Sequence, residues 1–571
     1  MSEILLEPGD THTEVAARSI EDGGVGIQPA PSSSIAQACR RFGDDYPPLG
    51  NNWRVRSSSV LLMFTACVYV PWMIAHLNIG APWVSGPFLA ANVLTLVSVF
   101  LTSANSWHRS VPERKTLAEG GEPHVAVIIP TCGESIPMIL RTIASVTEQN
   151  WPADKLTVIV SDDGHDSGLE AAVTAIGVLY HSPPPRWAPG RDGAAKAGNL
   201  NSALAMIDAD FPSIEFIETR DADDEVGSNN FLREVMGQLV ADERLAYVQT
   251  IKEAQVSAGD PFNNRESMFY RNQMLSKNAA NAVFPCGSGV VWRRVALRDI
   301  GDFPVWNLVE DLQSGFEALR RGWKSMYVPI VGAVGQHAPE DVPNVFKQRG
   351  TWALDTVRLM LWADSKGLSK RQFAHFAMLL LYYLTSFSVL TYFYCIIASL
   401  MGTSPVNDNS LVALAFILPF AFANEIWLLA SNYPYNDRRK QQRHQFRDVW
   451  RARVLWTGMS TVFAKAIILA VLGGRNKKPT YKVTRKEHDL RWHWRETLPH
   501  IILLASAMVL FVYAVVARTL TNIGQITVTL YFGSTYFGLL AGFVNRGRHG
   551  VKILRLPTVE RRWPFVGQKL G

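Results

Sequence analysis

The sequence has few cysteines, and its basic blocks are confined to the segments that flank apolar runs. Both features limit what the protein can be. Its five cysteines are scattered through 571 residues without a Cys-x-x-Cys pair, which argues against a disulfide framework and against a zinc site. No Lys/Arg block interleaved with aromatic residues lies outside the segments that flank apolar runs, so nucleic acid is not an expected partner. Residues 1–50 lack a basic stretch followed by an apolar one, and we expect a disordered cytosolic tail rather than a signal peptide.

Charged residues are missing from several long stretches of a chain that is 48% hydrophobic with a formal net charge of +6. Each of these stretches approaches or exceeds the roughly 20 residues that a lipid bilayer requires. They are residues 57–75, 77–107, 376–400, 498–516 and 523–544, together with 411–432, in which Glu425 is the one charged residue. The positions of Lys and Arg between them predict six membrane spans with both termini in the cytosol. A seventh run, 454–472, lies between two basic blocks and contains Lys465, which favours a helix in the cytosolic interface.

The segment between the second and third apolar runs has the pattern of a soluble α/β domain. Two short apolar runs, 125–129 and 156–160, are joined by a helical stretch at 138–149, which is typical of a parallel βαβ unit. Polar residues follow these runs and a third one. They are Pro130-Thr131, Asp162-Asp163 and Asp221-Ala-Asp223. Because ligands bind at the carboxyl ends of parallel strands, we expect these residues to converge on one edge of the sheet.

Asp221 and Asp223 stand two residues apart at the end of a predicted strand. Mg²⁺ and Mn²⁺ are bound by one or two carboxylates together with water and phosphate oxygens. The pattern therefore indicates a site for a nucleotide diphosphate. A solvated acidic turn is the alternative, since Asp-x-Asp is a common tripeptide.

Further motifs accompany this one in a fixed order. They are Pro130-Thr131 with Glu134, Ser161-Asp-Asp-Gly164, Lys196-Ala-Gly-Asn-Leu-Asn201, Asp221-Ala-Asp223, Phe284-Pro-Cys-Gly-Ser288, Val309-Glu-Asp311, Ala338-Pro-Glu340 and Gln348-Arg-Gly-Thr-Trp352. In this order they resemble the processive family 2 glycosyltransferases, the membrane synthases of cellulose, curdlan, mixed-linkage glucan, chitin and hyaluronan. The resemblance covers about residues 53–544. It implies an α/β GT-A-like glycosyltransferase domain inserted into an α-helical transmembrane bundle of about six spans plus interfacial helices.

The resemblance also implies an order of domains along the chain. The expected segments are a tail (1–50), a transmembrane hairpin (51–107), the GT-A domain (108–345), an interfacial segment with the Gln-x-x-x-Trp motif (346–375), a second hairpin (376–433), an interfacial helix with a gating loop (434–497), a third hairpin (498–544) and a basic cytosolic tail (545–571).

The family's functional residues fall on matching positions of this chain. The resemblance implies that Thr131, Glu134, Asp163 and Lys196 bind the donor, a UDP-sugar, and that Asp221 and Asp223 hold Mg²⁺ or Mn²⁺. Asp311 is the implied catalytic base, with the adjacent Glu310 as the competing candidate. A carboxylate there would take the proton of the acceptor hydroxyl. A single displacement would convert an α-linked donor sugar into a β-linkage.

On the acceptor side the resemblance points to Cys286, Gln348 and Trp352. Trp352 would stack beneath a sugar, although an interfacial anchor is the alternative. Thr351 occupies the place of the family's arginine, and Arg349 projects about 200° away from it on a helix, so a simple replacement is not expected. A last motif, Tyr481-Lys-Val-Thr-Arg-Lys486, resembles a gating loop that closes over the diphosphate, and a basic juxtamembrane linker is the alternative. Its motif residues are Tyr481, Val483, Thr484 and Lys486.

Polar residues inside two predicted spans suit either a conduit or helix packing. Glu425 lies in an otherwise uncharged run, and acids within membranes usually face inward. The last run carries hydroxyl groups that a polysaccharide could contact or that could pack helices together. These are Thr527, Thr529, Tyr531, Ser534, Thr535 and Tyr536.

We therefore expect a membrane synthase that polymerises glucose from UDP-glucose into a β-glucan and passes the polymer through its own bundle, with the plasma membrane as its expected location. Three alternatives stay open. They are synthesis of a chitin-like or hyaluronan-like polymer, transfer of a single sugar to a lipid phosphate, and export of carbohydrate by a transporter with a regulatory nucleotide domain.

Overall fold

The computed structural model describes most of the chain. The described residues are 52–186, 195–255, 268–336, 341–407, 412–431, 452–476, 493–521 and 523–549, with single positions in the intervening stretches and residues 32, 33, 36 and 37 near the N-terminus. The motif residues Tyr481, Val483, Thr484 and Lys486 lie outside this part of the chain.

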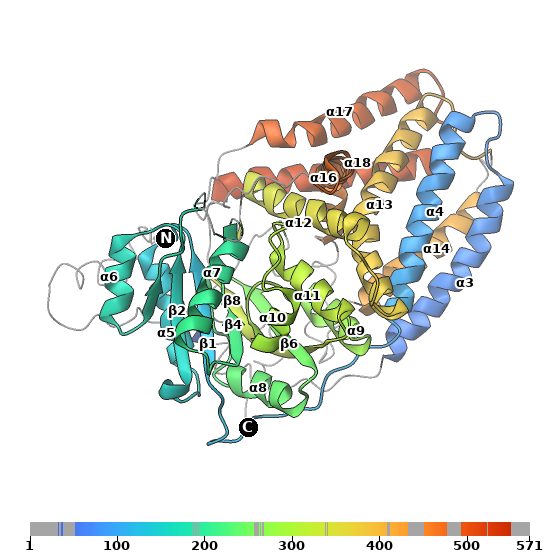
Figure 1. The fold of residues 1–571 in the computed structure, drawn as a ribbon. Coiled ribbons are helices and arrows are strands. Elements are labelled where there is room, and N and C mark those ends of the chain that lie inside the picture. Colours follow the sequence, from blue (N-terminus) through green and yellow to red (C-terminus); the bar gives the residue numbers. More distant parts are fainter. Residues whose placement is uncertain are drawn as a thin grey trace, which may run out of the picture.

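An eight-stranded mixed sheet forms the centre of the domain between the second and third apolar helices (Figure 1). Its strands are β1 (Val125–Thr131), β2 (Leu156–Asp162), β3 (Leu179–His181), β4 (Phe216–Thr219), β5 (Asp224–Glu225), β6 (Leu245–Ala254), β7 (Val290–Arg293) and β8 (Lys324–Gly335), in the order β3-β2-β1-β4-β7-β6-β8-β5. The first four neighbours run parallel, and β7 is antiparallel to both β4 and β6. A half that is wholly parallel, joined to a mixed half, is the GT-A-like arrangement expected from the sequence.

Strand β1 shows why the sheet is buried on both faces. All seven of its residues are buried, and successive side chains of a strand point to opposite faces. Ala126 and Ile128 pack in one core with residues of α7 (Ala195–Asp210), whereas Val127 and Ile129 pack in another with residues of α5 (Ile136–Thr147). The run 125–129 is apolar at every position because its alternate side chains pack into two different cores. The predicted βαβ unit of β1, α5 and β2 is confirmed.

The remaining helices of this domain are short. They are α6 (Ser167–Ala175), α8 (Phe231–Ala241), α9 (Met274–Ala279), α10 (Arg294–Ile300) and α11 (Glu310–Arg320), together with the short segments η1 (Ala153–Lys155) and η2 (Phe269–Gln273).

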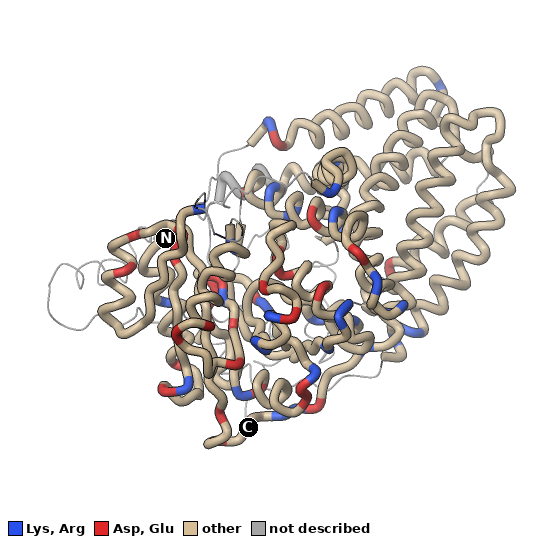
Figure 2. Tube along the Cα trace, in the orientation of Figure 1, with Lys and Arg blue, Asp and Glu red and all other residues tan. Residues whose placement is uncertain are grey.

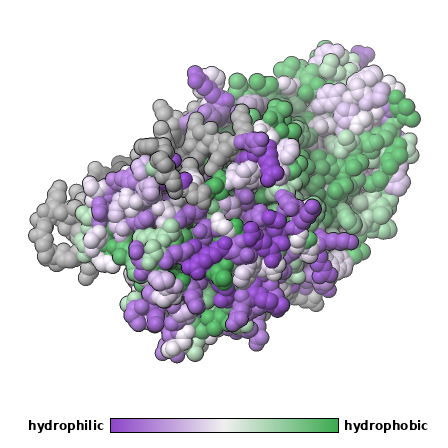
Figure 3. All heavy atoms as spheres, viewed as in Figure 1, coloured by the Kyte–Doolittle hydropathy of each residue, from purple (hydrophilic) through white to green (hydrophobic). Residues whose placement is uncertain are grey.

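Five long apolar helices form a bundle beside the sheet domain. They are α3 (Trp53–Ala75), α4 (Pro82–Asn105), α13 (Lys370–Leu400), α14 (Val412–Ser431) and α17 (Trp494–Val516). Charged residues concentrate in the sheet domain and are sparse along these helices (Figure 2). The visible surface divides in the same way, hydrophilic over the sheet domain and hydrophobic over the bundle (Figure 3). Together these features describe a membrane protein.

The other two predicted membrane segments are less simple. The sixth predicted span forms α18 (Ile523–His549), but within the described residues it is not one of the five helices that are both long and apolar enough to cross a bilayer. The segment predicted to lie in the interface forms two helices, Ala452–Gly458 and α16 (Ser460–Gly473), with a bend of 50° between them. A helix pair bent in this way fits a broken span or a re-entrant segment, and its interfacial placement stays a prediction.

Helix α12 (Val342–Trp362) connects the two halves of the molecule. It carries the Gln348 motif and lies between the sheet domain and the bundle (Figure 1). Its residues Val345 and Ala353 are buried against Met459 and Phe463 of the bent helix segment. The Asp341 side chain caps its N-terminus by accepting a hydrogen bond from the Asn344 amide at 2.8 Å, so the start of this helix is fixed.

Candidate active site

One cavity of about 1410 Å³ extends from the carboxyl edge of the parallel strands into the helical bundle. At the sheet end it is lined by Thr131 at the end of β1, by Asp163 after β2, and by Asp221 and Asp223 after β4. These strands are neighbours in the order β2-β1-β4, so their ends lie side by side. The predicted convergence of the three polar segments on one edge is confirmed.

Asp163 is held at the cavity by two arginines. Its carboxylate forms ion pairs with Arg191 at 2.6 Å and Arg186 at 2.9 Å, and the side chain is 2% exposed. The preceding residue, Asp162, does not line the cavity. It accepts hydrogen bonds from the backbone amides of Gly164 and Asp166, at 2.7 Å each, and so shapes the loop. Of these two adjacent aspartates, only Asp163 lines the cavity.

The Thr131 hydroxyl donates to Glu134 at 2.8 Å, and the Cys132 amide donates to the same carboxylate at 2.6 Å. Both Thr131 and Glu134 line the cavity near Asp163. Lys196, the fourth residue that the sequence assigned to the donor, lines the same cavity, so all four are brought together.

Asp221 lies at the centre of a charge network. One carboxylate oxygen accepts a hydrogen bond from Lys196 at 2.5 Å and the other from Lys252 at 2.7 Å. Lys252 also forms an ion pair with Asp224 at 2.7 Å. Burial opposes ionisation of Asp221, but the two ammonium groups outweigh it and hold its pKa well below the ordinary range. The opposite charges hold Lys196 above its ordinary pKa despite its burial.

The residues present fit a divalent cation of the magnesium type. Among the described residues no three His, Cys, Asp or Glu side chains come together as a closed metal site. Mg²⁺ does not need one, because water and phosphate oxygens complete its coordination around one or two carboxylates. Asp221 and Asp223 both line the cavity and are the two carboxylates that would hold it. The lysines that engage both oxygens of Asp221 would then share that carboxylate with the cation.

Asp311 stands in the first turn of α11 and lines the same cavity. Burial and the neighbouring Glu310 carboxylate raise the pKa of Asp311 to about 7. Glu310 forms an ion pair with Lys196 at 3.4 Å and is therefore engaged with the charge network. These environments favour Asp311 over Glu310 as the group that gains and loses a proton near neutral pH.

Gly287 allows the backbone to approach both Asp311 and Lys196. It has φ of +78°, and a Cβ at this position would lie 3.1 Å from the Asp311 carboxylate and 3.1 Å from the Lys196 ammonium. Its carbonyl oxygen accepts a hydrogen bond from Lys196 at 2.9 Å. The neighbouring Cys286 lines the cavity, and its amide donates to Gln249 at 2.8 Å. The backbone of the Phe284-Pro-Cys-Gly-Ser288 motif therefore forms part of the cavity wall, close to Asp311 and Lys196.

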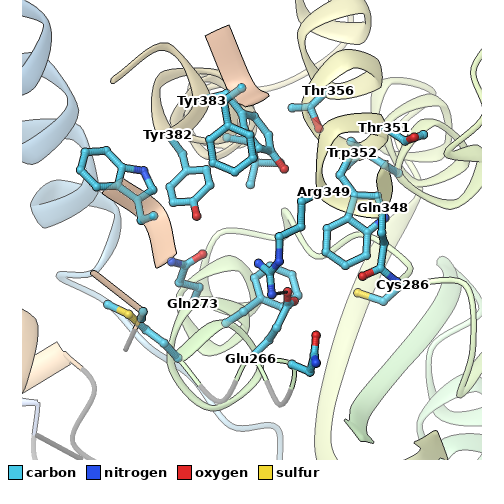
Figure 4. Close-up of a pocket in the computed structure, with 18 of the residues that line it drawn as sticks. Glu266, Gln273, Cys286, Gln348, Arg349, Thr351, Trp352, Thr356, Tyr382 and Tyr383 are labelled. Carbon is cyan, nitrogen blue, oxygen red and sulfur yellow. Dashed lines mark ion pairs between the residues drawn. The ribbon is translucent and has the colours of Figure 1, made fainter. Parts of the chain in front are cut away.

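Beyond Asp311 the cavity is lined by Gln348, Arg349, Thr351 and Trp352 of α12. Figure 4 shows the Arg349 side chain pointing from α12 toward Glu266, with which it forms an ion pair at 3.3 Å. The guanidinium carbon also lies 5.9 Å from the centre of the Trp352 ring. Arg349 and Thr351 both line the cavity although they project in different directions, because the cavity extends around this part of the helix.

The cavity continues between the apolar helices. Its lining there includes aromatic and hydroxyl side chains and one ion pair, between Glu425 of α14 and Arg453. The lining aromatic and polar residues of this end include Asn92, Thr95, Tyr382, Tyr383, Tyr392, Phe420, Trp427, Trp456, Thr527, Tyr531 and Phe532. The sequence left lining and helix packing open for Glu425, Thr527 and Tyr531, and all three line the cavity.

Several residues of the site were not identified from the sequence. Arg186 and Arg191 lie in a loop after β3, Lys252 is near the end of β6, and Glu266 follows it. Lys252 had a recognisable signal, since it is a cation that follows the buried run Leu245–Ile251. The arginines and Glu266 had none, because their partners are distant along the chain.

Comparison with known proteins places this geometry in a family. Residues 123–354 match the model described as glycosyltransferase like family 2. The cellulose synthase catalytic subunit (UDP-forming) of Pseudomonas fluorescens is 28% identical over 404 residues, which cover 68% of this chain and 51% of that protein. Putative cellulose synthase 2 of Komagataeibacter xylinus is 25% identical over 556 residues, which cover 90% of this chain and 34% of that protein.

Among solved structures, a mannosyltransferase of Pyrobaculum calidifontis in complex with GDP-Man and Mn²⁺ aligns with a TM-score of 0.48 at 19% identity, over 67% of this chain and 99% of that one. This chain spans about half or less of the length of the two curated relatives. The matched segment contains every site residue described above from Thr131 to Trp352. Residues 123–354 thus form a domain that matches the family 2 glycosyltransferases and is inserted between long apolar helices, and the chain is similar to cellulose synthase catalytic subunits.

Proposed function

We propose that the protein is a processive, inverting glycosyltransferase that polymerises glucose from UDP-glucose into a β-glucan and moves the polymer across its membrane. The observation that carries this proposal is the continuity of the cavity, which is lined by Asp163 and Asp221 at one end and by Asn92 and Tyr531 at the other. A single-sugar transferase needs a donor site and a short acceptor pocket. A polymer, in contrast, needs neutral aromatic and hydroxyl side chains along its whole path, and such side chains line the cavity between the helices.

The donor end suits a nucleoside diphosphate sugar. Thr131, Glu134 and Asp163 offer hydrogen-bonding groups for the uridine part, and the positive charge of Lys196 and Lys252 lies where the diphosphate would be placed. Asp221 and Asp223 would hold Mg²⁺ or Mn²⁺, which supplies additional positive charge to the leaving diphosphate. The similar catalytic subunit of Pseudomonas fluorescens is UDP-forming, and this supports UDP over other carriers.

The transfer step follows from the position of Asp311. Its carboxylate takes the proton of the acceptor hydroxyl, the oxygen of that hydroxyl bonds to the anomeric carbon, and the bond between that carbon and the diphosphate breaks with its electron pair leaving on UDP. Attack from the face opposite UDP converts an α-linked donor into a β-linked product. Because burial raises the pKa of Asp311 to about 7, the group can accept this proton and release it again near neutral pH.

The acceptor end suits a neutral sugar chain. Trp352 and Tyr382 offer aromatic faces, and Gln348 and the hydroxyls of the bundle offer hydrogen bonds. Aromatic faces bind the apolar faces of glucose rings, and polar groups at the rim bind the hydroxyls. The same cavity would accept other β-linked polymers, so the assignment of glucose rests on the cellulose synthase relatives. We place the sheet domain in the cytosol and the protein in the plasma membrane, following the distribution of Lys and Arg.

Product analysis tests this proposal. The full chain in lipid nanodiscs with Mg²⁺ is supplied separately with labelled UDP-glucose, UDP-N-acetylglucosamine, UDP-glucuronate and UDP-galactose, with Asp311→Asn as the inactive control. We expect a polymer from UDP-glucose alone that a β-glucanase degrades. Labelled lipid without polymer would overturn the processive assignment, and a polymer from another donor would overturn the choice of glucose.

A further inference from the structure

Asp355 is a fully buried carboxylate on α12, three residues beyond Trp352, and the reaction described above does not use it. It does not line the cavity, but it contacts the segment that leads into α11, the helix that carries Asp311. One of its oxygens accepts hydrogen bonds from the backbone amides of Leu308 at 2.7 Å and Val309 at 2.8 Å. Its backbone carbonyl accepts a further hydrogen bond from the side chain of Asn307 at 3.2 Å.

The segment that Asp355 holds is the start of α11. Val309 is the residue before the helix, and Glu310 and Asp311 form its first turn. The Val309 side chain makes no cap hydrogen bond to this helix. The backbone before the helix is thus fixed by a carboxylate from another helix, and the position of Asp311 depends on that contact.

Arg358 extends the contact one turn further along α12. Its guanidinium lies 3.8 Å from the second carboxylate oxygen of Asp355 and 4.6 Å from the centre of the Trp306 ring. Arg358 and Trp306 both donate hydrogen bonds to the carbonyl of Arg475, at 3.4 Å and 3.0 Å. The Asp355 side chain therefore lies within a packed junction of α12, the segment 306–309 and the end of the α16 region.

We propose that Asp355 is a positioning residue that fixes the segment 307–309, just before α11, to helix α12. Asp311 on α11 then keeps a constant place relative to Gln348 and Trp352 on α12. This proposal rests on the proposed function, because it assigns Asp311 as the base. Asp355 acts by accepting hydrogen bonds from two backbone amides and does not touch the substrate. Polymerisation requires the acceptor end and the base to stay in register over many cycles, and this contact joins them directly.

The test compares Asp355→Ala, which removes the acceptor atoms, with Asp355→Asn, whose amide oxygen can accept both hydrogen bonds without the charge. We expect Asp355→Ala to lower kcat by about 10²-fold, which is the order of loss caused by a displacement of about 1 Å at a catalytic group. The affinity for UDP, measured by calorimetry, stays unchanged because the donor end is built from other elements. Asp355→Asn recovers most of the lost kcat.

Two control variants separate positioning from general stability. Asp341→Ala removes the N-cap of α12, and the Asp341 side chain contacts Asn344 and not the segment before α11. Asp364→Ala removes an exposed carboxylate just beyond α12. Neither lowers kcat as Asp355→Ala does. Equal losses in Asp355→Asn and Asp355→Ala, a parallel loss of UDP affinity, or the same loss in Asp341→Ala would overturn the proposal.

Hydrogen exchange distinguishes this proposal from the proposed function. In the wild type the Leu308 and Val309 amides exchange slowly, in Asp355→Ala they exchange faster, and in Asp355→Asn they stay protected. If no donor gives a polymer, the proposed function fails. The kcat of the Asp355 variants is then measured from the hydrolysis of the UDP-sugar to UDP and free sugar. Faster exchange in Asp355→Ala with unchanged hydrolysis would show a purely structural contact and would overturn the positioning role.

Discussion

At the sheet end of the cavity, charged side chains meet within hydrogen-bonding distance, whereas the described residues of the bundle end place the Glu425–Arg453 ion pair among aromatic and hydroxyl groups. Lys196, Asp221, Lys252 and Asp224 form one connected network near the proposed diphosphate position. Glu425 and Arg453 form an ion pair between helices, beside Tyr531. A dense charge network in a buried site fixes geometry and responds strongly to any lost partner. A mobile, neutral polymer, as proposed for the bundle end, would need weaker, repeated contacts.

The largest effect is expected at the base. Asp311→Asn keeps the shape of the side chain but removes its capacity to accept a proton, and should lower polymer synthesis by about 10²–10⁴-fold. Binding of UDP, measured by calorimetry, should be nearly unchanged, because Asp311 does not belong to the donor contacts. The matched variant Glu310→Gln should cost far less. If Glu310→Gln abolished synthesis and Asp311→Asn did not, the roles of the two residues would have to be exchanged.

The next effect is expected at the centre of the charge network. Asp221→Asn removes a carboxylate that both lysines contact, and it removes one of the two ligands expected for the cation. The affinity for UDP in the presence of Mg²⁺ should fall by about 10- to 100-fold. In EDTA the wild type and the variant should bind UDP with similar affinity. An Mg²⁺ response in Asp221→Asn as large as that of the wild type would remove Asp221 from the metal site.

The pH dependence of the rate reports the environment of Asp311. Because burial and Glu310 raise its pKa to about 7, the carboxylate is protonated and inactive below this pH. The rate of synthesis should therefore rise as the pH increases through about 7. Glu310→Gln removes the negative charge that opposes ionisation of Asp311, and its pH–rate profile should move to lower pH. A profile that is flat between pH 5 and 8, or unmoved in Glu310→Gln, would contradict this electrostatic account.

The sequence predicted the sheet end far better than the bundle end, for a physical reason. Carboxylates at strand ends can be recognised because they follow short apolar runs. Strands β1, β2 and β4 run parallel, so the residues at their carboxyl ends lie together at one edge of the sheet. Asp163, Asp221 and Asp223 could therefore be grouped before the fold was known. The cavity between the helices depends on how α4, α13, α14 and α18 pack. A run of apolar residues does not specify how helices pack. The sequence therefore left open whether Thr527 and Tyr531 line a cavity or pack against a neighbouring helix.

Pairs formed across long sequence distances were also missed. Lys252 joins Asp221 from a different strand, and Arg349 joins Glu266 across 83 positions of the chain. The helical-wheel argument for Arg349 and Thr351 gave their relative direction but not the shape of the cavity around α12. Asp355 was missed for a related reason, since a buried acid on an amphipathic helix has no local signature. Its partners, the amides of Leu308 and Val309, are backbone groups that every sequence contains.

The smallest effect is expected at the bundle end. Glu425→Gln replaces one member of the ion pair with Arg453 and should change the rate of elongation by about two- to tenfold, the effect of losing a hydrogen bond worth about 0.5–1.5 kcal/mol. UDP binding and donor hydrolysis should be unchanged. Phe422→Leu, at a side chain that is 62% exposed on the same helix, is the matched control and should leave elongation unaffected. A loss of UDP binding in Glu425→Gln would show that the two ends of the cavity are not separable.

The most direct test of the account is to locate the polymer relative to the membrane. The full chain is reconstituted in sealed proteoliposomes, UDP-glucose and Mg²⁺ are added outside, and only molecules with the sheet domain outside can react. The account predicts that the growing glucan enters the lumen and resists β-glucanase added outside until detergent opens the vesicles. Polymer that is fully degraded before detergent is added would contradict it, because the cavity between the helices would then not carry the product.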